Sequence, residues 1–339
     1  MAGKNPLYSL FAIIYEREKF LMWKYILKRI LLMIPVILGV VILVFTLMQL
    51  TPGDPAEVIL GSTATAEQIE ELRNELGLND PYIVQLGRYM RDVFLRFDFG
   101  TSYISNVSIT AELAVRFPKT LIFAVAGMVL SLVIGIPLGV TAAVHQNSLA
   151  DYGTMAIALI GTSLPGFWFA LVLILVFSNQ LGWLPAYGIG GIEYWIMPVI
   201  STAFAGITTM ARQMRSGMLE VIHSDYITMA KAKGVKKRSV IYRHALPNAL
   251  IPVITVASMS FGTSLGGTLI AETIFSIPGV GVYIVNAVNN RDYPVVQGGV
   301  IILAITFSFI MLACDLLIAA IDPRVKAQIT GGKKRGKKK

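Results

Sequence analysis

The sequence predicts an all-α polytopic membrane protein with six transmembrane helices. The chain has 339 residues, of which 55% are hydrophobic and only 14% are charged, whereas soluble domains carry about 25% charged residues. The apolar residues are gathered into six separate runs, and most of them approach the length of about 20 residues that crosses a bilayer. Lys and Arg are concentrated in alternate connections between these runs, as expected for a chain that crosses a membrane repeatedly.

The six apolar runs differ in how many charges they contain. The first run has none, and we place its helix within residues 24–50. The fourth run would include Arg212 and Arg215 if it extended toward Met218, and Asp315 interrupts the sixth. The expected spans are Ile30–Met48, Leu121–Val144, Gly153–Phe177, Tyr194–Met210, Ala249–Ile270 and Gly298–Ile321.

The segment before the first span, residues 1–23, is predicted to be cytoplasmic. Its apolar part, Leu7–Tyr15, is short and four charged residues follow it, so we expect no cleavable signal peptide. A short helix lying in the membrane interface is expected over residues 7–22.

The distribution of basic residues predicts the orientation. Six Lys and Arg lie in the first 29 residues, eight in residues 212–247 and eight after Ile321, while the loops 180–193 and 271–296 hold only Arg291. Because basic loops stay in the cytoplasm, both termini and the 212–247 loop are predicted to be cytoplasmic. Residues 51–117 hold five Arg and ten acids, and this segment is long enough to lie outside regardless of charge.

The outer segment 51–117 is predicted to be folded. Thr65 with Gln68 has the spacing of a capping box, and Gly77 can end the helix that follows. Asp80 and Pro81 start a second helix. Its apolar residues recur at helical spacing, and they are Leu86, Tyr89, Met90, Val93, Phe94 and Phe97. These faces would pack on the spans, although a docking surface for a partner is an alternative.

Glycine and proline in the spans indicate bending and close helix packing. Pro137, between Gly135 and Gly139, is expected to kink the second span. Gly262 and Gly266 in the fifth span have GxxxG spacing, which lets a neighbouring helix approach closely. Packing is the expected role of these glycines, and contact with a transported molecule is the alternative.

Several kinds of chemistry are absent from the sequence. It contains no GxxxxGK[ST] loop for nucleotide phosphates, no HExxH zinc motif and no GxSxG nucleophile motif. The single cysteine, Cys314, excludes a disulfide within the chain. We therefore expect a protein that is not an enzyme, with no metal or cofactor of its own and no nucleic-acid partner.

Two acidic residues lie in or near the predicted spans, Glu272 at the outer end of the fifth and Asp315 inside the sixth. Carboxylates inside a membrane are often functional. These two would be the coupling acids of an ion-driven carrier, but the sequence offers no basic residue at the depth of either. They are kept as structural or possible pathway residues, together with Gly262 and Gly266.

The stretch YITMAKAKGVKKRSVIYRHALPN, residues 226–248, carries six Lys or Arg and one His and no acid. Asp225 can cap a helix over Tyr226–Lys233, and Gly234 suits the left-handed position after it. A second short helix is expected over Lys236–Arg243, with Leu246 and Pro247 marking the entry to the fifth span. The alternative is a basic surface that binds anionic lipid headgroups and needs no partner protein.

This elbow offers a small-residue face through Ala230 and Ala232, as expected of a helix that sits in a partner's groove. Ala230, Gly234, Leu246 and Pro247 match the spacing of the EAA loop of ABC importer permeases, while Thr228, Met229 and His244 depart from it. The departure at Thr228 removes the Glu of that motif and any salt bridge it would make.

Further motifs agree with the peptide branch of that family. They are LTPGDPA (50–56), LGLNDPYIVQ (76–85), FDFGTSY (97–103), AETIFSIPGVG (271–281), RDYPVVQG (291–298) and DPR (322–324). Over residues 24–326 the chain resembles the permease subunits of dipeptide and oligopeptide ABC importers.

The resemblance implies a type I importer permease in a bacterial or archaeal cytoplasmic membrane. Its core would be residues 118–326, with a coupling loop at 217–247 and a basic cytoplasmic tail at 327–339. Implied partners are a second homologous permease, two ATPases that hold ATP and Mg, an extracytoplasmic binding protein and the lipid bilayer. The implied ATPase-coupling residues are Asp225, Tyr226, Ala230, Lys233, Gly234, Val235, Arg238, Leu246 and Pro247.

Other functions remain open at this point. The same machinery could import nickel, glutathione or an oligosaccharide, because selectivity lies largely outside these motifs. A secondary carrier would need deep coupling acids and an inverted repeat, neither of which is evident. A membrane scaffold would suit the outer segment but not the glycine- and proline-rich spans.

Overall fold

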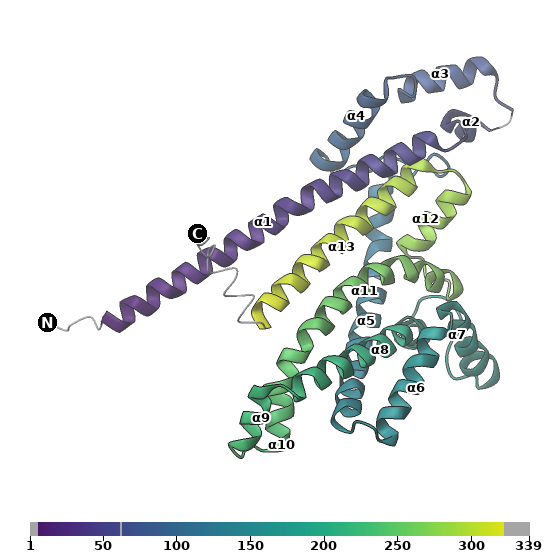
Figure 1. Ribbon diagram of the computed structural model, residues 1–339. Helices are drawn as coiled ribbons and strands as arrows, with labels where there is room; N and C mark the ends of the chain where they lie inside the picture. The colour runs from purple at the N-terminus through teal and green to yellow at the C-terminus, as the bar shows by residue number, and fades with distance from the viewer. Residues whose placement is uncertain (1–5, 62, 322–339) are drawn as a thin grey trace.

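The computed structural model describes residues 6–61 and 63–321, and within them the side chains of residues 23–61, 63–266 and 268–319. The described chain is almost entirely helical, with a single isolated bridge between Thr101 and Ser108 (Figure 1). Five helices are long and apolar enough to cross a membrane, and there are six if one bent pair counts as a span. The all-α fold is therefore confirmed. The DPR motif and the tail 327–339 lie outside the described residues.

The first span is part of one long helix, α1 (Pro6–Leu50). It lies beside the last helix, α13 (Tyr293–Ile321), which runs along much of its length (Figure 1). The prediction of a separate short helix over 7–22 was wrong, because the helix continues without a break. Residues 7–34 contain neither Gly nor Pro, so no residue in this stretch interrupts a helix.

Three short helices follow α1 and form an arc over its end (Figure 1). They are α2 (Pro55–Leu60), α3 (Ala66–Leu76) and α4 (Tyr82–Leu95). Both capping-box bonds between Thr65 and Gln68 are present, and Gly77 is left-handed with φ 65°. The two helices predicted in this segment are thus present as α3 and α4. Helix α2, which begins at Pro55 under the cap of Asp54, was missed.

The packing of this outer segment is partly as predicted. Leu86 and Val93 of α4 are buried, and Val93 packs against α1 and α13. In contrast, α3 has no buried residue, and the Phe97 side chain is 74% exposed rather than packed. Asp292 secures the loop 98–108 by accepting hydrogen bonds from the Ser102 hydroxyl (2.5 Å) and the Tyr103 N–H (3.0 Å).

The core of the bundle is the contact between α5 (Ile109–Val144) and α8 (Glu193–Ile222), the most extensive helix pair. Small residues at every fourth position of α5 allow the two helices to approach closely. A Cβ on Gly135 or Gly139 would lie 2.8 Å or less from backbone oxygens of α8. The Ser131 hydroxyl, between them and Gly127, donates to the Ala203 carbonyl at 3.1 Å. Pro137 lies inside α5, which continues as one helix to Val144.

The third span is not a single helix. It consists of α6 (Leu149–Ser163) and α7 (Gly166–Leu173), which continues as a π-helix over Ile174–Gln180, and the two halves are bent by 102°. The span expected over Gly153–Phe177 is thus present as a bent pair of helices, and the bend itself was not predicted. Pro165 accounts for the break, because a residue before proline is driven out of the helical region. Leu164 accordingly has ψ 129°.

The remaining helices are α9 (Asp225–Ala232), α10 (Lys237–Ser239), α11 (Leu246–Ile274) and α12 (Val280–Asn289). The expected GxxxG contact of α11 is only half present. A Cβ on Gly262 would meet the Phe307 ring of α13 at 2.4 Å, whereas one on Gly266 would meet nothing within 4 Å. Gly262 is thus a packing residue, and Gly266 is not part of a close helix contact in this chain.

Candidate functional site

The first arm of the elbow is α9. It follows α8 after a two-residue turn, and its N-cap is Ser224, whose backbone is extended (ψ 152°). The prediction that Asp225 caps this helix was wrong. Asp225 is instead the first helical residue, where its negative charge favours the helix N-terminus. The Ser224 hydroxyl donates to the Val221 carbonyl at 2.6 Å and so secures the turn out of α8.

The corner of the elbow is a Schellman motif at Gly234. Its φ is 77°, the left-handed conformation that only glycine adopts without strain. The Gly234 N–H donates to the Lys231 carbonyl at 3.0 Å, and the Val235 N–H donates to the Ala230 carbonyl at 3.3 Å. These are the two bonds that define the motif. The left-handed conformation predicted for Gly234 is confirmed, and Ala230 and Val235 take part in the motif through their backbones.

The second arm runs into the fifth span without a break. After α10, residues Val240–Ala245 form a π-helix that continues directly into α11. The prediction of a separate helix over Lys236–Arg243 ending before Leu246 was therefore wrong. Pro247 has no N–H to donate and its ring displaces the carbonyl four residues earlier. A wider π-turn at this point accommodates that ring.

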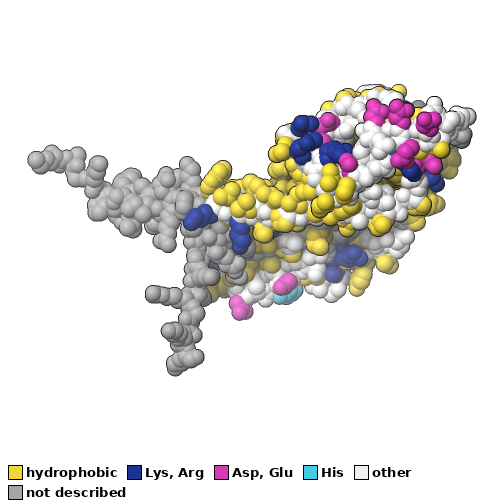
Figure 2. All heavy atoms as spheres, turned by 90° about the horizontal axis from the view of Figure 1, so that it is seen from above, with side chains coloured by type: hydrophobic (Ala, Val, Ile, Leu, Met, Phe, Trp, Pro, Cys, Tyr) yellow, Lys and Arg dark blue, Asp and Glu magenta, His cyan; other side chains and the backbone are white. Residues whose placement is uncertain are grey.

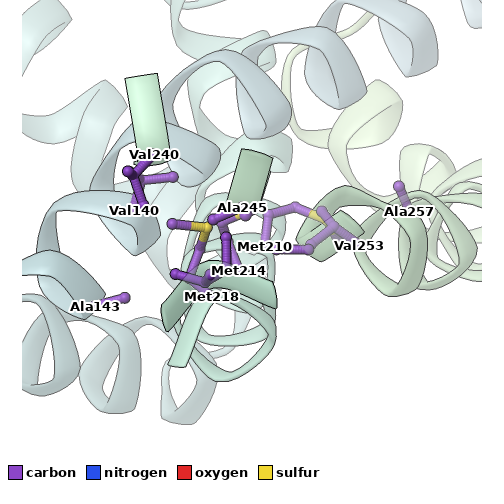
Figure 3. Packing of buried hydrophobic residues seen from close by; sticks show 11 residues of the cluster. Val140, Ala143, Met210, Met214, Met218, Val240, Ala245, Val253 and Ala257 are labelled. Atoms are coloured by element: carbon purple, nitrogen blue, oxygen red, sulfur yellow. The ribbon is translucent and has the colours of Figure 1, made fainter. Parts of the chain in front are cut away.

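The elbow rests on a stripe of methionines on α8, spaced one helical turn apart. Met210, Met214 and Met218 are fully buried and pack with residues of both arms and of α11 (Figure 3). From the arms come Ile227, Val240 and Ala245, all buried. The Tyr226 hydroxyl also accepts a hydrogen bond from the Asn248 amide at 2.9 Å. The elbow is thus fixed to α8 and α11, the two helices that it joins.

The outward face of the elbow is more apolar and more bulky than predicted. Met229 is 59% exposed, and Tyr226 and Tyr242 are also exposed. Of the expected alanine face, Ala232 is exposed and Ala230 is half-buried, so the elbow presents one of the two alanines among larger apolar side chains. Around these residues lie six exposed cations without an ion pair among the described residues. They are Lys231, Lys233, Lys236, Lys237, Arg238 and Arg243.

Behind the elbow lies a partly buried ion pair that was not predicted from the sequence. Arg215 of α8 donates two hydrogen bonds to the Asp151 carboxylate of α6, at 2.5 and 2.7 Å. Asp151 is 1% exposed and also accepts from the Asn147 N–H at 3.0 Å. The pair ties the first half of the broken span to the helix that carries the elbow. Arg215, which seemed costly in a span, is neutralised here.

A second feature of interest is a cleft of about 300 Å³ between α7, α8 and α11, which begins at the break of the third span. No charged residue lines it. Its polar groups are hydroxyls, from Ser201, Thr202, Thr263 and Ser264. An uncharged wall with hydroxyl groups can contact polar molecules of many shapes without holding any of them tightly.

The two acids singled out from the sequence are both engaged. Glu272 is fully buried, where its carboxylate accepts from the Thr120 hydroxyl (2.7 Å) and the Val282 N–H (3.1 Å). Asp315 pairs with Arg29 of α1 at 2.9 Å. The expectation that no base lies at the depth of Asp315 was therefore wrong. Arg29 escaped notice because it lies 286 positions earlier in the chain.

A polytopic helical bundle with an exposed, basic elbow between two of its spans defines the transmembrane subunit of a transporter. The chain belongs to the family described as the inner membrane component of binding-protein-dependent transport systems, which matches residues 135–327. The N-terminal component of the same family matches residues 22–124.

Curated relatives lie close to this chain along nearly its whole length. The dipeptide transport system permease protein DppB of Alkalihalophilus pseudofirmus is 42% identical over 333 residues, covering 90% of this chain and 100% of the relative. The glutathione transport system permease protein GsiC of Salmonella typhimurium is 40% identical over 305 residues, covering 90% and 99%. The chain is thus a transport permease subunit of an ABC importer.

Among solved structures, the inward-facing MetNI methionine ABC transporter resembles this chain with a TM-score of 0.53 at 21% identity. The match covers 62% of this chain and 97% of the other. It shows that the fold is that of an ABC importer permease.

Proposed function

We propose that this chain forms half of the translocation path of an ATP-driven importer of di- or oligopeptides. The observation that carries the proposal is the elbow, which is solvent-exposed and anchored on α8 and α11, and whose cations have no ion pair among the described residues. Such a surface suits an acidic groove on a cytoplasmic partner. The names of the relatives, a dipeptide permease and a glutathione permease, supply the substrate class.

The full assembly would contain a second, homologous permease, two ATPases and an extracytoplasmic binding protein. ATP and Mg would be held by the ATPases, since the sequence has no phosphate-binding loop. Both termini and the elbow would face the cytoplasm, and the α2–α4 arc would lie outside, as the distribution of Lys and Arg indicates. The membrane would be the cytoplasmic membrane of a prokaryote.

The mechanism follows from how the elbow is attached. When the ATPases close, α9 moves with them, and the methionine contact passes this motion to α8 and α11. The Asp151–Arg215 pair makes α6 move with α8. The break at Pro165 lets α7 respond differently, so the hydroxyl-lined cleft between α7, α8 and α11 would open and close. Its uncharged wall suits peptides whose side chains vary.

The test is to isolate the tagged chain gently from its own membranes and to identify what accompanies it. A second six-span protein and one or two P-loop ATPases are expected. Vesicles that contain the complex and the binding protein should then take up di- and tripeptides only with ATP inside. A chain that is isolated alone and transports with an ion gradient would contradict the proposal.

Glutathione is the second candidate substrate, favoured by the relatives that carry that name. It is itself a tripeptide, so competition between glutathione and trialanine in the same uptake experiment separates the two. Nickel or an oligosaccharide would be identified in the same way. An ion-coupled carrier is less favoured, because Asp315 and Glu272 already serve as partners of Arg29 and Thr120.

A further inference from the structure

A large cleft of the described chain lies beneath the α2–α4 arc rather than among the spans. It has a volume of about 880 Å³, within the range of small-molecule sites. Its roof comes from α3 and α4, and its floor comes from the end of α1, the loop 98–103 and the first turn of α13. The arc touches the bundle mainly through α4, which leaves the space beneath it open to the outside.

The lining of this outer cleft holds two buried hydroxyls that the fold does not use, those of Tyr89 on α4 and Tyr293 on α13. The Tyr293 side chain is 7% exposed and its hydroxyl has no hydrogen-bond partner among the described residues. Gln297, one turn further along α13, lines the same cleft and is 8% exposed. Buried polar groups are almost always paired, so two unpaired ones lining a single cleft point to a ligand that pairs with them.

The charges around the cleft favour a positive group on that ligand. Four carboxylates line it, against two guanidinium groups. Both arginines are already occupied, Arg73 by Asp54 and Arg88 by Asp80. Glu57 has no ionic partner among the described residues, and Asp98 accepts only the Gly100 N–H, at 2.9 Å. Figure 2 shows Asp and Glu side chains on the surface at this end of the molecule, with Lys and Arg side chains beside them.

Apolar surface completes the lining. Phe45 and Met48 of α1 and Phe99 of the loop lie at the floor. The cleft thus combines unneutralised carboxylates, two unpaired hydrogen-bonding groups and aromatic surface. A short peptide has the matching parts, which are an N-terminal ammonium, backbone amides and side chains.

We propose that the outer cleft binds a short peptide by its N-terminal ammonium. Glu57 and Asp98 would face this ammonium, and Tyr293 and Gln297 would form hydrogen bonds with the backbone of the peptide. The site would hold substrate on the permease between its release from the binding protein and its entry into the span bundle. This inference rests on the proposed function, because it takes peptides as the substrate class.

The experiment measures retention of radiolabelled trialanine by the full complex in nanodiscs, without ATP and without the binding protein. We expect saturable binding of one trialanine per copy of this chain. N-acetyl-trialanine, which lacks the ammonium, and the variant Glu57→Gln/Asp98→Asn should each bind at least about ten times more weakly, since each removes a charge-assisted pair worth about 1.4 kcal/mol or more. Tyr293→Phe should weaken binding several-fold while leaving the N-acetyl discrimination intact.

The matched control is Glu67→Gln/Glu71→Gln, which removes two exposed carboxylates of α3 that do not line the cleft and should bind trialanine as the wild type does. Equal binding of the free and acetylated peptides, or no effect of Glu57→Gln/Asp98→Asn, would overturn the proposal. The proposal would also be overturned if Glu57→Gln/Asp98→Asn no longer captured the binding protein but still retained trialanine, because the cleft would then be a docking surface for that protein. A complex that imports peptides but retains none here overturns this inference and leaves the proposed function standing.

Discussion

At the scale of single residues, Gly234 shows how one backbone angle can decide the shape of a coupling element. Its φ of 77° lies where a Cβ is strained, yet the space around it is open, so no contact restricts a side chain. The effect of a substitution is therefore purely conformational, on the order of 1–2 kcal/mol. Replacement changes the angle between the two arms rather than the packing beneath them.

We expect Gly234→Val to insert normally and to assemble, but to lose most transport while the ATPases continue to hydrolyse ATP. The measurement is uptake per ATP hydrolysed in vesicles. Gly182→Val is the matched control, since Gly182 also has a positive φ (64°) and open space around it but lies far from the elbow. If both variants lost the same fraction of transport, the effect would be general destabilisation and the elbow would not be the coupling element.

Glu272 is a second residue whose role the geometry restricts. A Cβ on Gly279 or Gly281 would lie within 2.7 Å of its carboxylate oxygens, so the loop before α12 wraps closely around the charge. The carboxylate links α11 to the loop before α12 and to α5 through Thr120. It is a structural anchor at the end of the bundle near the outer segment.

Glu272→Ala should lower the midpoint of thermal unfolding in detergent by several degrees. The Thr120 hydroxyl and the Val282 N–H would lose their acceptor, and each unpaired buried group costs about 1–3 kcal/mol. Glu193→Ala, an exposed glutamate at the start of α8, is the control and should leave the midpoint unchanged. The carrier alternative would be favoured if the Glu272→Ala protein were as stable as the wild type but had lost transport driven by an ion gradient.

At the scale of elements, several local signals were predicted correctly, although the cap of α9 and helix α2 were not, and the long-range contacts were missed. The capping box at Thr65, the left-handed Gly77 and the left-handed Gly234 depend on a few neighbouring residues, and each was predictable. The ion pairs of Asp151 and Asp315 join residues far apart in the chain, which no pattern of spacing reveals. Apolar run length also could not distinguish a straight span from one broken at Pro165.

The Asp151–Arg215 pair supplies a test at this scale. Removing one partner of a buried pair strands the other, at about 3–5 kcal/mol. We therefore expect Arg215→Ala to reduce both folded yield and transport, and the exchange Asp151→Arg/Arg215→Asp to restore part of each. Arg212→Ala, which removes an exposed arginine one turn earlier in α8, is the control. An exchange variant no better than Arg215→Ala would show that position, not pairing, matters.

At the scale of the whole molecule, the elbow and the α2–α4 arc lie at opposite ends of the bundle (Figure 1). The proposed orientation therefore makes opposite predictions for a label applied from one side. After Cys314→Ser, the variant Met229→Cys should react with a membrane-impermeant maleimide only in inside-out vesicles. Asn79→Cys, beyond α3, should react only in right-side-out cells. Reaction of both from the same side would refute the orientation.

The methionine stripe under the elbow has a mechanical consequence. Met210, Met214 and Met218 are unbranched, with three rotatable bonds each and a polarisable sulfur, so they adapt their shape at little energetic cost. Because these side chains can change shape, α9 can tilt by small amounts while it stays in contact with α8. Stiffening the methionine stripe with isoleucine at all three positions should preserve folding and slow the transport cycle, and leucine should do so less. Equal transport rates for the wild type, the triple isoleucine variant and the triple leucine variant would mean that α9 and α8 move together as one rigid body.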